Sequence, residues 1–355
     1  MTPVKINEVR LSSRFLRLQQ GLADEVDSRS VCLYRQLAAD RINISFLHLD
    51  FLRSPRQVTC LVAPEAVTRL EQSPEKDQNG GKETEPGRAA GLVSLFPHRF
   101  HPAVIGAVFC ALAQENAGWH CMATSGSMVT LAVDLSRQDR IAKAICRFVD
   151  LPPGKERLCP GEDYDVVARS LKSAPETVAQ YVEFRIKTYG LQVKTGLTLL
   201  SAYIPTDELG SWGRSLIDIT ERGFRFSYAS AAVGGDGKKI KLDLVIDPAG
   251  EKSINPDIVR HLPEGGGLSR LEITENAEMI CFHGPHFGDR YGIADKTLSR
   301  LEHFHVPVWL AGCVGATVTV VVPPDMGAAA EEALSDVFST PPRDRGNGKH
   351  GNRHE

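Results

Sequence analysis

The sequence lacks the apolar segments that would attach it to a membrane or direct it to secretion. No apolar run approaches the ~20 residues that a membrane-spanning helix needs. The first fifteen residues, MTPVKINEVRLSSRF, contain no apolar core of a signal peptide. A formal net charge of −3 leaves no basic field for nucleic acid or an anionic membrane. We therefore expect a cytoplasmic protein that binds neither nucleic acid nor membrane.

Signatures of catalysis and metal binding are also missing. The eight cysteines include no CxxC pair, and no HExxH, GxSxG or phosphate-loop motif occurs. The glycines at 234–237 and 264–267 are interpreted as turns. His98 and His101 stand three residues apart, but no zinc-ligand spacing surrounds them, so these histidines and those of the 283–305 region are interpreted as loop and surface imidazoles. The sequence predicts no cofactor and no metal site.

One order of elements is clearest in residues 92–133. An apolar run at 92–96 is followed by the loop 97–102, whose prolines break the strand. Ile105, Phe109 and Leu112 then recur at helical spacing, and residues 129–133 alternate with the two-residue period of a strand. The segment therefore predicts strand, helix, strand, strand.

The same order recurs three more times along the chain. The first repeat carries strands at 4–11 and 15–18, joined by a turn at Ser12 and Ser13, before its helix. The remaining strands and helices are recognised by the same two periodicities. They are predicted at 33–38 (helix), 42–46, 58–62, 191–193, 197–204, 209–219 (helix), 224–228, 240–246, 271–273, 279–282, 294–301 (helix), 306–310 and 318–322. Each repeat ends in a second helix, predicted at 64–70, 136–148, from 255–256, and at 325–338.

A βαββαβ unit of this size is the ferredoxin-like plait, an antiparallel sheet with helices on one face. The predicted fold class is therefore α+β, with tandem ferredoxin-like units, four in two pairs. The first and last units lack an obvious fourth strand, and we expect other chain, such as 157–159 or 3–10, to complete their sheets. The predicted boundaries are 1–71, a linker at 72–88, 89–160, a bridging helical segment at 161–189, 190–268, 269–340 and a disordered tail at 341–355.

Three short motifs resemble the ACT domains of aspartate kinases. Residues 101–133 have a proline-containing loop before the helix and the step Thr124-Ser125 at the end of the next strand. Residues 41–44, Arg-Ile-Asn-Ile, are similar to that family's Gly-Ile-Asn-Ile. Residues 289–294, Asp-Arg-Tyr-Gly-Ile-Ala, are similar to its Asp-Arg-Pro-Gly-Ile-Ala. No stretch resembles the kinase catalytic domain.

The resemblance implies an amino-acid site between paired units, with the ligand carboxylate held by amides of the first loop and helix start. The glycine of that junction survives only as Gly292, and the ligand-contacting asparagine only as Asn43, whose alternative role is a polar residue on an exposed strand face. Asn43 and the loop 287–293 are therefore the favoured places. The candidate ligand-binding residues are Asp27, Ser28, Asn43, Phe100, His101, Ala103, Val104, Phe287, Gly288, Asp289, Arg290, Gly292 and Ile293.

The resemblance further implies a non-catalytic regulatory protein whose effector is an amino acid. A partner enzyme of the aspartate pathway, or a homo-oligomer of this chain, would respond to the bound effector. One alternative is a structural adaptor whose units have lost their ligand. A third interpretation is an unrecognised enzyme that uses the histidines and aspartate of residues 283–290.

Overall fold

The computed structural model describes residues 4–22, 33–52, 56–66, 85–115, 118–153, 185–247, 261–263, 270–284 and 290–339. Most of the predicted linker, most of the bridging segment and the tail lie outside these ranges. Within them, no helix has both the length and the apolar character needed to cross a membrane.

The described secondary structure consists of sixteen strands, six α-helices and two short 3₁₀ turns. The strands are β1 (Val4–Lys5), β2 (Glu8–Leu22), β3 (Ile44–Asp50), β4 (Arg56–Val62), β5 (Glu85–Phe96), β6 (Trp119–Thr124), β7 (Val129–Asp134), β8 (Val149–Asp150), β9 (Ile186–Lys187), β10 (Gly190–Pro205), β11 (Phe226–Val233), β12 (Lys239–Ile246), β13 (Arg270–His283), β14 (Leu310–Val314), β15 (Thr317–Val322) and β16 (Phe338–Ser339). The helices are α1 (Leu33–Ala39), α3 (Pro102–Glu115), α4 (Gln138–Ile145), α6 (Leu209–Glu221), α8 (Ile293–His303) and α9 (Gly327–Ser335), with 3₁₀ turns η2 (Leu135–Arg137) and η3 (Thr206–Glu208).

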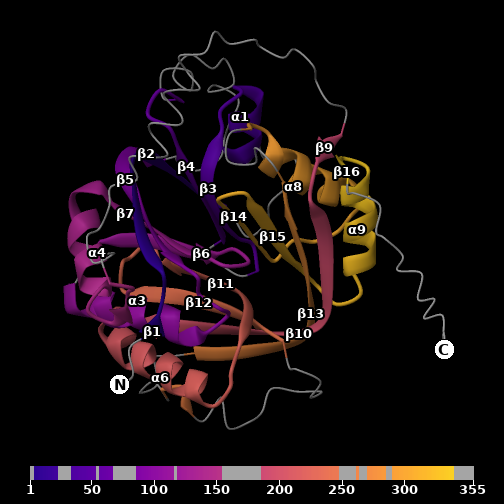
Figure 1. The fold of residues 1–355 in the computed structure, drawn as a ribbon. Coiled ribbons are helices and arrows are strands. Elements are labelled where there is room, and N and C mark those ends of the chain that lie inside the picture. The colour runs from indigo at the N-terminus through magenta and orange to yellow at the C-terminus, as the bar shows by residue number, and fades with distance from the viewer. Residues whose placement is uncertain are drawn as a thin grey trace, which may run out of the picture.

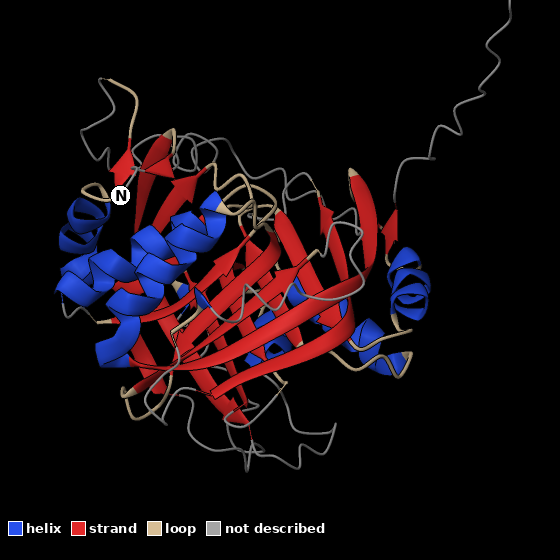
Figure 2. Ribbon diagram, turned by 90° about the horizontal axis from the view of Figure 1, so that it is seen from below, coloured by secondary structure: helices blue, strands red, loops and turns tan. Residues whose placement is uncertain are grey.

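Twelve of these strands close into one barrel (Figures 1 and 2). Their order is β10-β12-β11-β6-β7-β5-β2-β4-β3-β14-β15-β13, and every neighbouring pair is antiparallel. The short pairs β1–β8 and β9–β16 are parallel and lie outside the barrel. A large antiparallel sheet with separate helices confirms the predicted α+β class.

The order strand, helix, strand, strand recurs four times among the described elements. We call these the first segment (β2, α1, β3, β4), the second (β5, α3, β6, β7), the third (β10, α6, β11, β12) and the fourth (β13, α8, β14, β15). Strands β2 and β5 join the first two segments, and β10 and β13 join the last two. Strands β3 and β14 then join the first segment to the fourth, while β6 and β11 join the second to the third. Closure of the barrel therefore makes the first and fourth segments neighbours.

Several breaks between predicted strands are bends within long strands. The turn expected at Ser12 and Ser13 is wrong: β2 continues through a register shift, with Arg14 in the left-handed region at φ 70°. Strand β10 likewise passes through Gly196 at φ 65°, and β13 through Asn276 at φ 58°. A bulge bends a strand and sharpens its twist. Each long strand can therefore take part in two neighbouring segments of the barrel.

The long strands also supply the fourth strand that the first and fourth segments lacked. In the first segment the sheet β3-β4-β2 continues into residues 85–90 of β5, and in the fourth β14-β15-β13 continues into residues 190–194 of β10. The prediction of added strands is confirmed, but the strand at 3–10 is not their source, and 157–159 lie outside the described residues. Strand β5 begins inside the predicted linker, and β9 shows that the predicted bridging helix does not reach residue 189.

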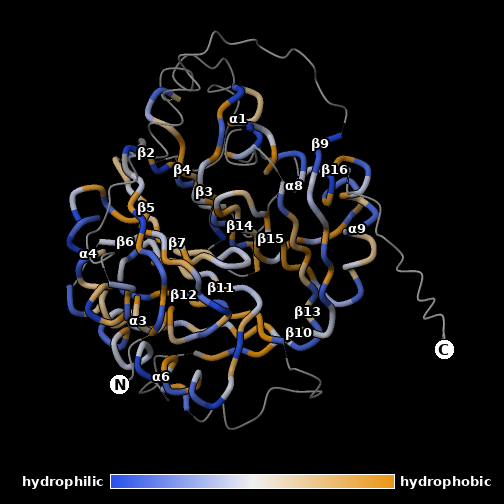
Figure 3. The backbone as a smooth tube through the Cα atoms, viewed as in Figure 1, coloured by the Kyte–Doolittle hydropathy of each residue, from blue (hydrophilic) through white to orange (hydrophobic). Residues whose placement is uncertain are grey.

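Helices cover the outside of the barrel in two groups. Helices α3, α4 and α6 lie over the second and third segments, and α1, α8 and α9 lie over the first and fourth (Figures 1 and 2). Helix α3 is buried from Pro102 to Leu112, whereas α4 and α6 also carry exposed polar residues (Figure 3). Two separate outer cores result, one beneath each group of helices.

The barrel interior contains buried charges as well as apolar side chains. Lys241 Nζ lies 2.8 and 2.6 Å from the two carboxylate oxygens of Asp50 and 3.6 Å from Asp243. Ser201 donates a 2.5 Å hydrogen bond to Asp243. The side chains of the lysine and the two aspartates are only 10%, 4% and 2% exposed. This cluster therefore links the first segment to the third across the interior.

Candidate functional site

A pocket lies where helix α8 of the fourth segment meets the start of β3 in the first. It is small and partly open: its cavity volume is about 10 Å³, and the full space of about 290 Å³ within its wall includes open solvent. Four predicted ligand-binding residues lie in its wall, although they come from opposite ends of the chain. Its lining residues are Tyr34, Asn43, Ile44, Arg290, Gly292, Ile293, Ala294, Asp295 and Cys313.

Asn43 reaches the pocket because helix α1 ends in a Schellman turn. The N–H of Ile42 donates to the carbonyl of Leu37, and the N–H of Arg41 donates to that of Ala38. Arg41 has the left-handed φ of 55° that this motif requires. The turn reverses the chain into β3, and the half-buried Asn43 stands at the junction. Its amide can donate to a carboxylate and accept from an ammonium group.

The start of helix α8 forms the opposite wall. Gly292 is the N-cap with φ 80°, a conformation that favours glycine, and its carbonyl accepts the N–H of Lys296. Amides in the first turn of a helix have no intrahelical acceptor and carry partial positive charge. Burial, together with the nearby Arg290 guanidinium, lowers the pKa of Lys296. This wall is therefore electropositive and suited to an anionic group such as a carboxylate.

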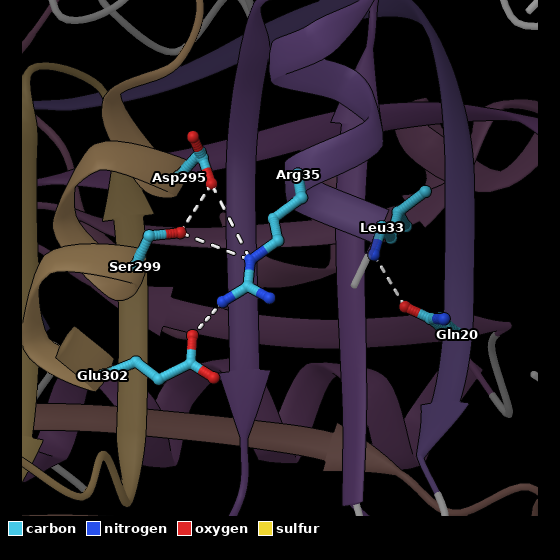
Figure 4. A network of polar contacts seen from close by, with 6 residues as sticks. All are labelled: Gln20, Leu33, Arg35, Asp295, Ser299 and Glu302. Carbon is cyan, nitrogen blue, oxygen red and sulfur yellow. Dashed lines mark hydrogen bonds and ion pairs between the residues drawn. The ribbon is translucent and has the colours of Figure 1, made fainter. Parts of the chain in front are cut away.

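Asp295 is the one acidic side chain among the lining residues. Ser299 donates a 2.7 Å hydrogen bond to its Oδ1, and Arg35 Nε of helix α1 lies 4.0 Å from the same oxygen (Figure 4). The Arg35 guanidinium also bonds Ser299 and pairs with Glu302. The pocket consequently offers an acceptor of fixed position for a cationic group, beside an electropositive helix start.

The remaining wall is apolar. Tyr34 on α1 and Cys313 on β14 are both about 4% exposed. Burial raises the pKa of the Cys313 thiol to about 12, so this cysteine is protonated and contributes a small apolar surface. No three His, Cys, Asp or Glu side chains gather closely enough for a metal site within the described ranges.

The corresponding place in the other half of the barrel is filled by the protein's own side chains. Here helix α3 of the second segment begins beside α6 and β11 of the third. Ala103 donates its N–H to Thr220 Oγ1 at 2.7 Å, and the carbonyl of Phe100 accepts the N–H of Phe226 at 3.0 Å. Ala103 and Val104 are only 5% and 1% exposed. Arg225 stands where Asn43 stands in the first segment, immediately before the strand.

His98 shows why this second place is closed. Its ring lies 5.1 Å from that of Phe100 and 4.9 Å from that of Phe226, measured between centroids. The N–H of Phe100 donates to Nδ1, so the neutral ring donates from Nε2 to the carbonyl of Ser125. Burial lowers its pKa to about 4. The surface interpretation is therefore wrong for His98, which is fully buried and fixes the loop; His101 is partly exposed.

The structure thus divides the predicted ligand-binding residues into three sets. Asn43, Arg290, Gly292 and Ile293 line one pocket. A second set lies together at the start of α3: Phe100, His101, Ala103 and Val104. There the N–H of Ala103 is bonded to Thr220, and the carbonyl of Phe100 is bonded to Phe226. Asp27, Ser28, Phe287, Gly288 and Asp289 lie outside the described residues. Sequence reasoning missed Tyr34, Asp295 and Cys313; the only local signal was an acidic residue in the first turn of a helix.

No protein-family model matches the sequence, and no curated protein matches it significantly. Among solved structures, the aspartate kinase from Synechocystis aligns with 95% of this chain and 56% of its own, with a TM-score of 0.67 and 14% identity. The regulatory subunit of aspartate kinase from Thermus flavus aligns with 43% of this chain and 99% of its own (TM-score 0.38, 13% identity). The Clostridium acetobutylicum aspartate kinase aligns with 45% and 37% (TM-score 0.37, 20% identity). The first likeness shows a shared fold, and this chain spans little more than half of that kinase.

Proposed function

We propose that this chain is a non-catalytic regulatory protein that binds an amino acid in the pocket between α8 and β3. The observation that carries the proposal is the pocket itself. It combines a helix start and Arg290 for a carboxylate, Asp295 for an ammonium group, and Asn43, which can bond either. These are the two charged groups that every free amino acid carries, and the apolar wall is left for its side chain.

In this proposal the four segments are ACT-like units, and the pocket lies at the interface of the first and fourth. The fold shared with the Synechocystis aspartate kinase supports it. The chain would act on a partner such as an enzyme of the aspartate pathway, or on further copies of itself. The bound amino acid would favour one packing of the paired units, and the partner would respond to that packing.

Isothermal titration of the protein with each of the twenty L-amino acids tests the proposal. We expect one or a few to bind, and Asn43→Ala to weaken them about 10-fold because hydrogen bonds to a charged ligand are lost. Asn7→Ala, at an exposed asparagine before β2, is the matched control and should bind as the wild type does. No binding by any of the twenty would refute the proposal.

The second candidate is a structural adaptor that binds no ligand. It is favoured by the second and third segments, where Thr220 already occupies the amide of Ala103. A pull-down from the native cell with and without the twenty amino acids distinguishes the two. A stoichiometric partner that is retained equally in both conditions would favour the adaptor.

A further inference from the structure

Helices α1 and α8 are joined by polar contacts that centre on one side chain, Arg35. Its guanidinium contacts Asp295, Ser299 and Glu302, which occupy successive turns of α8 (Figure 4). On its other side α1 is bonded to the barrel, because Gln20 of β2 accepts the N–H of Leu33 at 2.7 Å. The buried faces of α1 and α8 share one apolar core, and Arg35 adds the polar contacts between the outer parts of the two helices.

The equivalent helices in the other half, α3 and α6, approach each other more closely. Helices α3 and α6 cross at Gly106 and Gly213, so closely that a Cβ on Gly106 would lie 2.4 Å from the carbonyl oxygen of Gly213. That crossing belongs to a buried apolar core. At α1 and α8 the side chains of Arg35, Asp295 and Glu302 are 27%, 30% and 40% exposed. Ion pairs of this exposure are weak and rearrange easily, whereas a close-packed crossing does not.

Asp295 belongs both to this contact and to the pocket. Its Oδ1 accepts from Ser299 and faces Arg35, and in Figure 4 the second carboxylate oxygen points away from them. We propose that Arg35 is a positioning residue of the pocket, which fixes the Asp295 carboxylate and transmits a change in its contacts to helix α1. This inference rests on the proposed function, because it assumes that an amino acid binds beside Asp295.

The consequence is reciprocal. An ammonium group that binds the second oxygen of Asp295 restricts this carboxylate further, and Arg35 then holds α1 more firmly against α8. By linkage, if a bound ammonium group strengthens the contact of Arg35 with Asp295, that contact strengthens ammonium binding by the same factor, and a variant without it should bind the ammonium group more weakly. The carboxylate end of the ligand, bound at the helix start and Arg290, is not affected.

Titration of four proteins tests this prediction: the wild type, Arg35→Gln, Arg35→Lys and Arg300→Gln. Each is titrated with the twenty L-amino acids, and with the 2-hydroxy acid that matches the tightest binder and lacks only its ammonium group. Arg300 is the matched control, since it lies on α8 at similar exposure but pairs with Asp336 away from the pocket. Hydrogen exchange of the α1 amides is measured with and without the tightest-binding amino acid.

We expect Arg35→Gln to weaken the amino acid about 3- to 10-fold while changing the 2-hydroxy acid less than about 2-fold. Arg35→Lys should recover part of the loss, and Arg300→Gln should behave as the wild type. The amino acid should slow exchange in α1 of the wild type but not of Arg35→Gln. Equal loss for both compounds, or no loss, would overturn the inference and leave the proposed function standing. A wild type that binds no amino acid would overturn both.

Discussion

The charge cluster inside the barrel predicts a large and pH-dependent effect of Lys241→Met. The substitution keeps roughly the side-chain volume but removes the cation between Asp50 and Asp243, which are almost completely buried. Removing one partner of a buried ion pair costs about 3–5 kcal/mol, because an uncompensated charge is left behind. We expect a loss of that size in the free energy of unfolding at pH 7.5.

The pH dependence separates this cause from a packing defect. In the wild type, burial already raises the pKa of Asp243 to about 6, although Lys241 opposes the shift. Without Lys241 the pKa of Asp243 rises further above the ~3.9 of an unfolded aspartate. The folded variant then binds more protons than the unfolded chain, so its stability falls as pH rises through this window. The difference from the wild type should therefore shrink between pH 7.5 and pH 5.

Urea unfolding followed by tryptophan fluorescence measures both quantities. Lys239→Met, at an exposed lysine two residues earlier on β12, is the control and should change stability by less than about 0.5 kcal/mol. Adding Asp50→Asn to Lys241→Met should restore part of the loss at pH 7.5, because it removes one buried charge. A Lys241→Met protein within about 1 kcal/mol of the wild type, or a pH-independent loss, would refute the reasoning.

Two further predictions concern the other half of the barrel. Gly106→Ala would force α3 and α6 apart by about 1 Å, and overpacking of about 1–3 kcal/mol should exceed the ~1 kcal/mol gained in helix propensity. Thermal unfolding should show this loss, whereas Gly210→Ala on α6, whose new Cβ would meet Ala113 Cβ at 3.3 Å and the end of the Arg214 side chain at 3.7 Å, should be close to neutral. His98 is buried with its pKa lowered to about 4, so the unfolded chain binds more protons between about pH 6.5 and 4, and stability is lost as pH falls through that window. His98→Gln should remove up to about 3 kcal/mol of this acid sensitivity in urea unfolding at pH 7 and 4.5, while His303→Gln, at an exposed histidine, should not.

Local periodicity predicted the strands and helices but not how the strands continue. The alternation at 240–246 corresponds to β12, and that at 129–133 to β7. The polar pair Ser12 and Ser13, however, has the same local signature in a turn and in a bulge. Only the pairing of β2 with β5 distinguishes the two.

Closure of the barrel also buries the polar face of β12, which local alternation alone would place in solvent. Lys241 and Asp243 alternate with apolar residues, a pattern typical of a strand with one side in solvent. In the barrel that second side faces the interior, and the two residues are buried there. The alternation itself was therefore correct, but it could not tell an exposed face from an enclosed one.

The site was predictable only where a motif marked it. The resemblance indicated Asn43, Gly292 and Ile293, and these residues meet in the pocket. Their meeting, and the contribution of Tyr34 and Asp295, depend on β3 pairing with β14 across nearly the whole chain length. No local pattern of residues contains that information.

The two halves of the chain meet at two junctions. Strand β3 pairs with β14 at one, and β6 pairs with β11 at the other. Residues 4–153 form six consecutive barrel strands with two free edges, and residues 185–339 form the other six. Such an arrangement is that of a two-fold dimer, but here both halves belong to one polypeptide, so their association does not depend on protein concentration. A dimer of identical halves must build both junctions alike. A single chain is free of that symmetry, and in this protein one junction is sealed by glycines and aromatic rings while the other keeps a pocket.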